Sequence, residues 1–130
     1  MREFEDICII DDDAIAIFGL KRSMESIGLS KNISVFENGL DAFESFEQLI
    51  KKGLKLPSVI FIDLNMPVMD GWDFMHEFVK IHPSEKEMPL IFIMTSSIDR
   101  KDVEKAKTYN LEGNYVVKPI TSEVLKRIMA

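Results

Sequence analysis

Cysteine, histidine and tryptophan are scarce in this sequence, whose 130 residues include one cysteine, two histidines and one tryptophan. A single cysteine excludes an intrachain disulfide and a cysteine-rich metal site, so Cys8, which lies in an apolar run, is expected to be a buried structural thiol. No apolar stretch approaches the roughly 20 residues that a membrane helix needs, and membrane insertion is not expected. The acidic start leads directly into a strand-like run, unlike a signal peptide, which predicts cytoplasmic residence.

An excess of basic residues is also missing: 16 Lys and Arg stand against 22 Asp and Glu, for a net charge of -6. This balance gives no general attraction to a nucleic-acid backbone, so direct binding of nucleic acid is not expected. Most acids fall on expected helix faces, where solvation explains them, but the triplet Asp11–Asp13 is an exception. The length predicts one domain spanning residues 1–130.

Strand and helix signals alternate five times along the chain, which predicts an α/β protein with a parallel sheet and right-handed crossovers. The expected strands are short apolar runs: Ile7–Ile10, Ile33–Phe36, Val59–Ile62, Leu90–Met94 and Tyr115–Val117. The second is the least apolar, which predicts a place near a sheet edge. Between them, apolar residues at helical spacing predict inward helix faces that include Leu20, Met24, Leu40, Phe43, Phe46, Met75, Phe78, Val79, Val103, Ala106, Val124 and Leu125. Asp13 and Thr121 are expected helix caps, and Gly28 an expected helix end.

Polar residues follow four of the five expected strands. Because parallel strands point the same way, Asp11, Asp12, Asp63, Thr95 and Lys118 gather at one edge if those four strands are neighbours. Three carboxylates this close would raise one another's pKa values unless a cation neutralised them. Mg²⁺ fits best, because it takes one or two carboxylates and shares its remaining positions with water and phosphate oxygens.

A carboxylate can also attack phosphorus and form an aspartyl phosphate. Asp63 is the natural candidate because it stands alone at the end of its strand, which leaves Asp11 and Asp12 for the metal. A phosphoryl group in transfer spreads negative charge over three oxygens. We expect Mg²⁺ to take one of them, Lys118 another, and the Thr95 hydroxyl with nearby backbone N–H groups the third.

Each of these residues also has an interpretation that needs no chemistry. An acid pair after a strand often caps a helix. A threonine at a strand end commonly bonds the local backbone, and a lysine is commonly solvated. Asp70–Gly71 alone is a turn signal, and His76 and His82 are expected at the surface. The order and location of the whole set are what favour a site.

The sequence closely resembles the receiver domain of two-component response regulators, of the single-domain chemotaxis-regulator kind, over essentially its whole length. The matching segments are Ile9–Asp13, Phe61–Gly71, Ile93–Ser96 and Tyr115–Ile120. The resemblance implies a flavodoxin-like, doubly wound sheet of five parallel strands in the order 2-1-3-4-5, with helices on both faces. It implies a phosphoacceptor signalling switch that is not a conventional enzyme and acts only on itself, by phosphoryl transfer and autodephosphorylation.

By the same resemblance, Asp63 is the phosphoacceptor, charged by a histidine kinase or a phosphotransfer protein. Asp12 corresponds to the direct Mg²⁺ ligand, Asp11 to its partner through water, and Asn65 to the residue that offers its backbone carbonyl. With Asp63 itself, these residues form the implied metal site.

Lys118 and Thr95 match the pair that contacts the phosphoryl group, and Lys118–Pro119 matches a cis peptide of the family. Thr95 and Tyr115 match the switch pair, whose movement changes the protein-binding face for a downstream protein that the sequence does not name. Ser97 lies where the family tunes the phosphoryl lifetime, and Ser96 stands where alanine is commoner.

Two alternatives stay open, and one feature departs from the family. Asp11 and Asp13 form a D-x-D pattern, which would suit a haloacid-dehalogenase-like Mg²⁺ phosphatase with Asp11 as nucleophile, but this leaves Asp63 without a role. A phosphorylation-independent interaction domain is disfavoured by the intact acidic set and by Lys118. The chain ends 12 residues after Lys118, which predicts a short last helix and either a trimmed output face or a further segment.

Overall fold

The computed structural model of the chain describes residues 6–29 and 32–129. Strands and helices alternate strictly: β1 (Asp6–Ile10), α1 (Ala14–Ser26), β2 (Asn32–Phe36), α2 (Gly39–Lys51), β3 (Val59–Asp63), α3 (Gly71–Ile81), β4 (Leu90–Thr95), α4 (Arg100–Thr108), β5 (Tyr115–Val117) and α5 (Ser122–Ile128). This alternation confirms the predicted α/β class. The last helix is short, as the sequence indicates.

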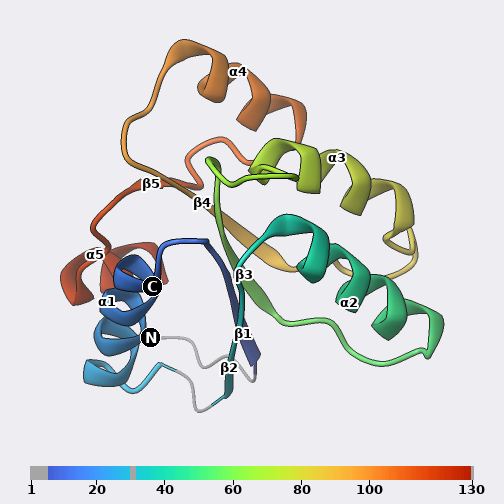
Figure 1. Ribbon diagram of the computed structural model, residues 1–130, viewed down its shortest axis with the longest axis horizontal. Helices are drawn as coiled ribbons and strands as arrows, with labels where there is room; N and C mark the ends of the chain where they lie inside the picture. Colours follow the sequence, from blue (N-terminus) through green and yellow to red (C-terminus); the bar gives the residue numbers. More distant parts are fainter. Residues whose placement is uncertain (1–5, 30–31, 130) are drawn as a thin grey trace.

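The five strands form one parallel sheet in the order β2-β1-β3-β4-β5, which confirms the topology that the resemblance implies. Strand β2 lies at an edge, as its weaker apolar character predicts. Helices α1 and α5 cover one face of the sheet, and α2, α3 and α4 lie on the other (Figure 1). The three central strands are therefore covered on both sides, which explains why they read as continuous apolar runs.

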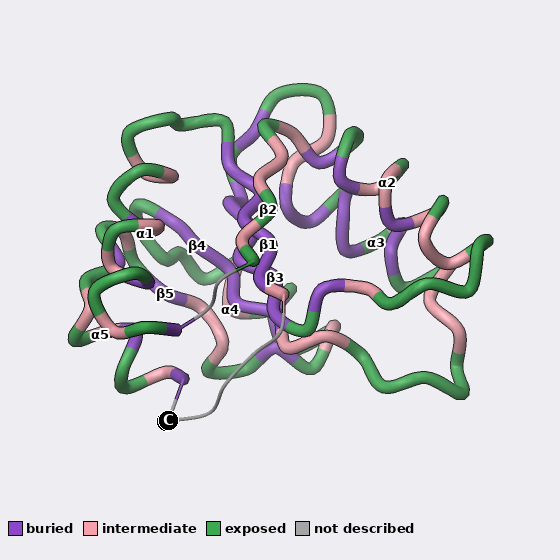
Figure 2. Tube along the Cα trace, turned by 90° about the horizontal axis from the view of Figure 1, so that it is seen from below, coloured by how far each residue is buried: buried purple, intermediate pink, exposed green. Residues whose placement is uncertain are grey.

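Alternate residues of each central strand point to opposite faces of the sheet. In β1, Cys8 and Ile10 pack with the α2–α3 side, whereas Ile7 and Ile9 pack with the α1–α5 side. The same strands form the buried centre of the molecule (Figure 2). Cys8 is a buried free thiol, as predicted; burial outweighs its hydrogen bond with Ser34 and raises its pKa to about 12, so it is unreactive at neutral pH.

The helix starts are encoded locally by short polar side chains. Asp13 accepts hydrogen bonds from two N–H groups in the first turn of α1, and Thr121 accepts one in α5, which confirms both predicted caps. Gly28 follows the end of α1 with a φ of +62°, a left-handed conformation that favours glycine. No helix among the described residues is both long and apolar enough to cross a membrane.

Two residues that the periodicity placed on inward helix faces lie at the rim instead. Leu40 in α2 is 37% exposed and Val79 in α3 is 42% exposed. In α3 the sheet-facing position is taken by Phe74, which is fully buried and stacks on Phe78 with ring centroids 5.4 Å apart. Phe46 of α2 packs edge-on against both rings, so the contact between α2 and α3 is made by this aromatic cluster and not by Val79.

Candidate functional site

Four strand ends bring polar side chains to one edge of the sheet. Asp11 follows β1, Asp63 ends β3, Thr95 ends β4 and Lys118 follows β5. Pairing fixes their relative positions, since Asp63 is in register with Met94, one residue before Thr95. The structure therefore brings these residues to the edge where the sequence predicts them.

The three acids of this edge lie within reach of one ion. Asp11, Asp12 and Asp63 each offer a carboxylate oxygen, and these oxygens all lie within 4.8 Å of one another. Asp11 and Asp63 are only 1% and 5% exposed, whereas Asp12 is exposed to solvent. The backbone N–H of Asp13 donates to Asp11 Oδ1 at 3.0 Å, which fixes the orientation of the buried carboxylate.

Lys118 is the cation that faces this cluster. Its Nζ lies 2.7 Å from Asp11 Oδ2 and 3.5 Å from Asp63 Oδ2. Asp11 Oδ2 is buried and accepts no well-directed hydrogen bond from the described residues, so this ion pair is what compensates its charge. Burial alone lowers the pKa of Lys118, but the carboxylates of Asp11 and Asp63 outweigh burial and raise it. The Lys118–Pro119 peptide bond is cis, as the resemblance implies.

The charge of the cluster is incompletely neutralised. Burial, followed by the negative charge of Asp11, raises the pKa of Asp63 to about 6. Lys118 and the backbone N–H of Asn65 act in the opposite direction and do not cancel this rise. Three carboxylates facing one ammonium group leave room for a second cation, and their hard oxygen atoms suit Mg²⁺. The residues present therefore fit the ion that the resemblance implies.

The Thr95 hydroxyl is hydrogen-bonded to Ser97 in this structure. The side chain is buried, its hydroxyl donates to the Ser97 carbonyl at 2.6 Å, and the Ser97 N–H donates back at 3.2 Å. The hydroxyl thus serves the local backbone of the loop between β4 and α4. Tyr115 is half-buried and packs against the core on the side of α2 and α3. Asn65 is exposed, directly after the Asp63–Leu64 pair.

Asp13 does not join the acidic cluster. Its Oδ1 accepts from Ile15 N at 3.0 Å and from Ala16 N at 3.4 Å, so this carboxylate is used to cap α1. The D-x-D pattern therefore places one acid in the cluster and the other on a helix end. This geometry does not favour the dehalogenase-like alternative.

Sequence reasoning missed two features around Asp63. A Cβ at Gly71 would lie 2.8 Å from the Asp63 carbonyl oxygen, so only glycine allows α3 to start this close to the end of β3. Further out, the indole Nε1–H of Trp72 donates to Asp102 of α4 at 3.0 Å. The Asp70–Gly71 turn signal could have indicated the first feature, but no local pattern indicates the second, which joins residues 30 positions apart.

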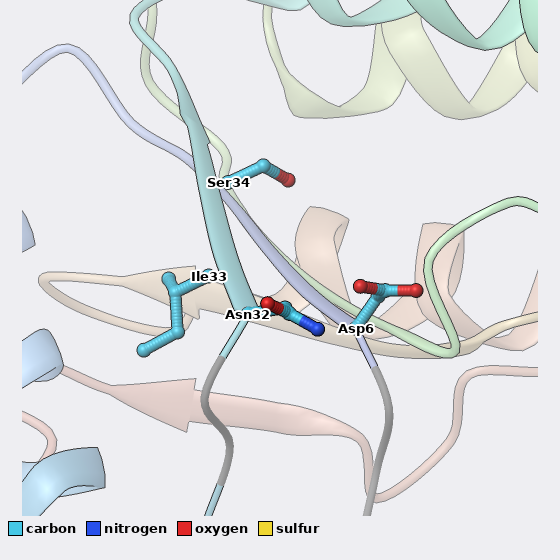
Figure 3. Close-up of a pocket in the computed structure, with 4 residues that line it drawn as sticks. All are labelled: Asp6, Asn32, Ile33 and Ser34. Atoms are coloured by element: carbon cyan, nitrogen blue, oxygen red, sulfur yellow. The ribbon is translucent and has the colours of Figure 1, made fainter.

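A separate hollow of about 350 Å³ lies at the opposite end of the sheet (Figure 3). It is lined by Asp6, Asn32, Ile33 and Ser34, at the amino ends of β1 and β2. Because Asp11 follows the other end of β1, this hollow is not part of the acidic site.

Comparisons with known proteins agree with this geometry. The chain is 28% identical over 120 residues to the chemotaxis protein CheY1 of Helicobacter pylori, covering 92% of this chain and 90% of that protein. It is 29% identical over 127 residues to the sensor histidine kinase CheAY of the same organism, covering 95% of this chain and only 14% of that protein. The crystal structure of a two component response regulator from Cytophaga hutchinsonii superimposes with a TM-score of 0.85 at 28% identity, covering 98% of this chain and 96% of that one.

The family comparison covers almost the whole chain. The profile of the response regulator receiver domain matches residues 7–130, which include the acidic triplet, Asp63, Thr95 and Lys118. Members of this family are signalling switches of two-component systems and not conventional enzymes. With the parallel sheet and the acidic cluster at its carboxyl edge, this match shows that the chain belongs to the response regulator receiver domain family.

Proposed function

We propose that Asp63 accepts a phosphoryl group from a histidine kinase or a phosphotransfer protein, and that the phosphorylated chain presents a changed face to a downstream protein. The observation that carries this proposal is the grouping of three carboxylates within 4.8 Å around a lysine that touches two of them. Such kinases use ATP inside the cell, so we also infer a cytoplasmic location. We further infer one receiver domain over residues 1–130, because the family profile matches residues 7–130.

Asp63 acts as the nucleophile in this proposal. One of its carboxylate oxygens attacks the phosphorus of a phosphohistidine, a P–O bond forms, the P–N bond breaks, and the imidazole leaves and takes up a proton. This step needs the ionised carboxylate. With a pKa of about 6, Asp63 is mostly ionised at pH 7, although less completely than an exposed aspartate. The same residue loses the group by attack of water on phosphorus.

Asp11, Asp12, Asp63 and the backbone carbonyl of Asn65 would hold Mg²⁺. When bound, the ion would offset the negative charge of the acids and of the transferred group. Asp11 is oriented for this by the Asp13 N–H, and its exposure of 1% keeps bulk water away from its oxygens.

Lys118 and Thr95 would bind the transferred group directly. Lys118 Nζ already lies 3.5 Å from Asp63 Oδ2, so a short movement away from Asp11 would bring the ammonium to a phosphoryl oxygen. Thr95 would release the Ser97 carbonyl and turn its hydroxyl toward Asp63. Tyr115 would follow into the space that Thr95 leaves, and the region of α4, β5 and α5 would change shape for the downstream protein.

Acetyl phosphate with Mg²⁺ tests the proposal without a named kinase. After incubation, mass spectrometry of the peptides should locate an adduct at Asp63 that hydroxylamine removes, as expected for an acyl phosphate. Asp63→Asn should abolish the adduct. An adduct at Asp11, or no adduct on the wild-type chain, would overturn the proposal.

A further inference from the structure

Helix α4 is weakly anchored, and its main anchor is a side chain of α3. Ala106 is the one buried residue within α4. Trp72 is only 8% exposed. Its indole N–H donates a hydrogen bond to Asp102 in the first turn of α4. The indole ring also stacks on Tyr109 at the end of α4, with ring centroids 6.0 Å apart and planes inclined by 14°. One indole therefore contacts both ends of the helix. Figure 1 shows α3 lying between α4 and α2 on this face of the sheet.

The backbone next to Trp72 packs against Asp63, the candidate phosphoacceptor. Trp72 follows Gly71, whose Cα approaches the Asp63 carbonyl so closely that a Cβ would lie 2.8 Å from it. The Gly71 N–H also donates to the Leu64 carbonyl at 3.1 Å. The indole is therefore carried by backbone that is packed against the end of β3.

A second connection reaches α4 through the loop after β4. The Thr95 hydroxyl donates to the Ser97 carbonyl, and two residues later Asp99 caps α4 by accepting from the Asp102 N–H at 2.9 Å. Asp102 is thus held from two directions, its backbone by the loop and its carboxylate by Trp72. A hollow of about 390 Å³, bordered by Trp72 and Tyr109, lies between α3 and α4.

We propose that Trp72 is a positioning residue that holds α4 in its resting place and opposes the switched arrangement. This rests on the proposed function, in which Thr95 turns toward a phosphoryl group on Asp63. The Ser97 carbonyl then loses its donor and the loop is released, but the carboxylate of Asp102 stays bonded to the indole. A hydrogen bond to a charged group is stronger than a neutral one, so the switched state must overcome it.

Removal of this hydrogen bond should favour the switched state and so tighten the binding of any ligand that selects it. Asp102→Ala removes the acceptor, and Trp72→Phe removes the donor and part of the ring that stacks on Tyr109 but keeps an aromatic side chain. Asp102→Asn is the matched control, since it loses the charge but keeps an oxygen that can accept from the indole. If the two groups act as one pair, the double variant should behave like either single variant.

The full chain is titrated with beryllofluoride, a phosphoryl mimic, in the presence of Mg²⁺ and followed by calorimetry. Asp102→Ala and Trp72→Phe should bind roughly 3- to 10-fold more tightly than the wild type, and Asp102→Asn, which keeps a weaker neutral hydrogen bond, should lie between the wild type and Asp102→Ala. In metal-free protein, acrylamide should quench the single tryptophan more efficiently in Asp102→Ala than in Asp102→Asn.

Unchanged affinity in both variants, with a lower melting temperature, would assign the hydrogen bond a purely structural role and overturn the inference. Weaker binding would also overturn it, because the bond would then belong to the switched state. A wild-type chain that neither binds beryllofluoride nor accepts a phosphoryl group from acetyl phosphate would instead overturn the proposed function. These results are distinguishable, since the acrylamide measurement reads the Trp72–Asp102 contact without any ligand.

Discussion

Replacement of Asp63 by asparagine is expected to stabilise the metal-free protein at neutral pH. Burial and the nearby Asp11 raise the pKa of Asp63 from 3.8 to about 6, so the folded state resists its ionisation. A tenfold change in an acid constant corresponds to 1.36 kcal/mol, and the ionised carboxylate therefore lowers the free energy of unfolding by about 3 kcal/mol. Asparagine has the same shape without the charge, and Lys118 keeps its 2.7 Å contact with Asp11.

The gain should depend on pH in a defined window. Below about pH 3.8 the carboxyl is protonated in both the folded and the unfolded chain, and Asp63 has no effect of this kind. As the pH rises from about 3.8 to about 6, the unfolded chain releases this proton before the folded chain does, so the wild type loses stability relative to Asp63→Asn; above about 6 the difference is constant. Urea unfolding of both proteins in EDTA at several pH values between 4 and 8 measures this difference directly.

The controls separate charge from a general effect of substitution. Addition of Mg²⁺ should stabilise the wild type and reduce the advantage of Asp63→Asn, because the ion offsets the charge that the substitution removes. Glu87→Gln, at an exposed acid in the loop before β4, should show no such gain. Equal stability of wild type and Asp63→Asn at pH 7, or an advantage that grows as the pH falls, would refute the reasoning.

Three further substitutions probe the same edge of the sheet. Lys118→Met should lower the free energy of unfolding of the metal-free protein by roughly 3 kcal/mol, because the buried acids lose their cation. For the same reason its affinity for Mg²⁺ should rise in a calorimetric titration, and weaker Mg²⁺ binding would contradict this. Gly71→Ala should cost about 1 to 3 kcal/mol in thermal unfolding, since its Cβ would meet the Asp63 carbonyl, whereas Gly19→Ala in α1 has open space and should stabilise the protein. Asp13→Ala should lower stability by about 1 kcal/mol as a lost cap and leave the acetyl phosphate reaction unchanged; loss of that reaction would revive the D-x-D interpretation.

The strands and the helix starts could be predicted from the sequence because their causes are local. The central strands β1, β3 and β4 are covered on both sides, so almost every residue in them is apolar. The caps Asp13 and Thr121 use side chains that act on the next few N–H groups. The grouping of polar residues at one sheet edge could be predicted from the same apolar runs, given that the strands are parallel neighbours.

Other features depend on contacts between distant segments and could not be predicted in this way. The strand order came from the resemblance alone, because alternation of strands and helices is compatible with several orders. Val68 has a φ of +69°, unusual for a β-branched residue, at the centre of a γ-turn in which Met69 N donates to Pro67 O at 2.8 Å. The next residue of this loop meets a distant segment, because the Met69 carbonyl packs so tightly on Gly39 that a Cβ there would lie 2.7 Å away.

The resting charge of the site also explains why metal and phosphoryl binding should be linked. At neutral pH the edge carries three carboxylates and one ammonium group, and phosphorylation replaces one carboxylate charge with a group that carries nearly two. The imbalance then grows, and Lys118 must be shared between the phosphoryl oxygens and the buried Asp11. A divalent cation would offset the added negative charge and reduce the competition for Lys118, so the phosphorylated chain should bind Mg²⁺ more tightly than the unmodified chain. By reciprocity, Mg²⁺ must favour the phosphorylated state by the same factor. The repulsion between Asp63 and Asp11, which adds to burial in raising the pKa of Asp63, is thus the physical origin of this linkage.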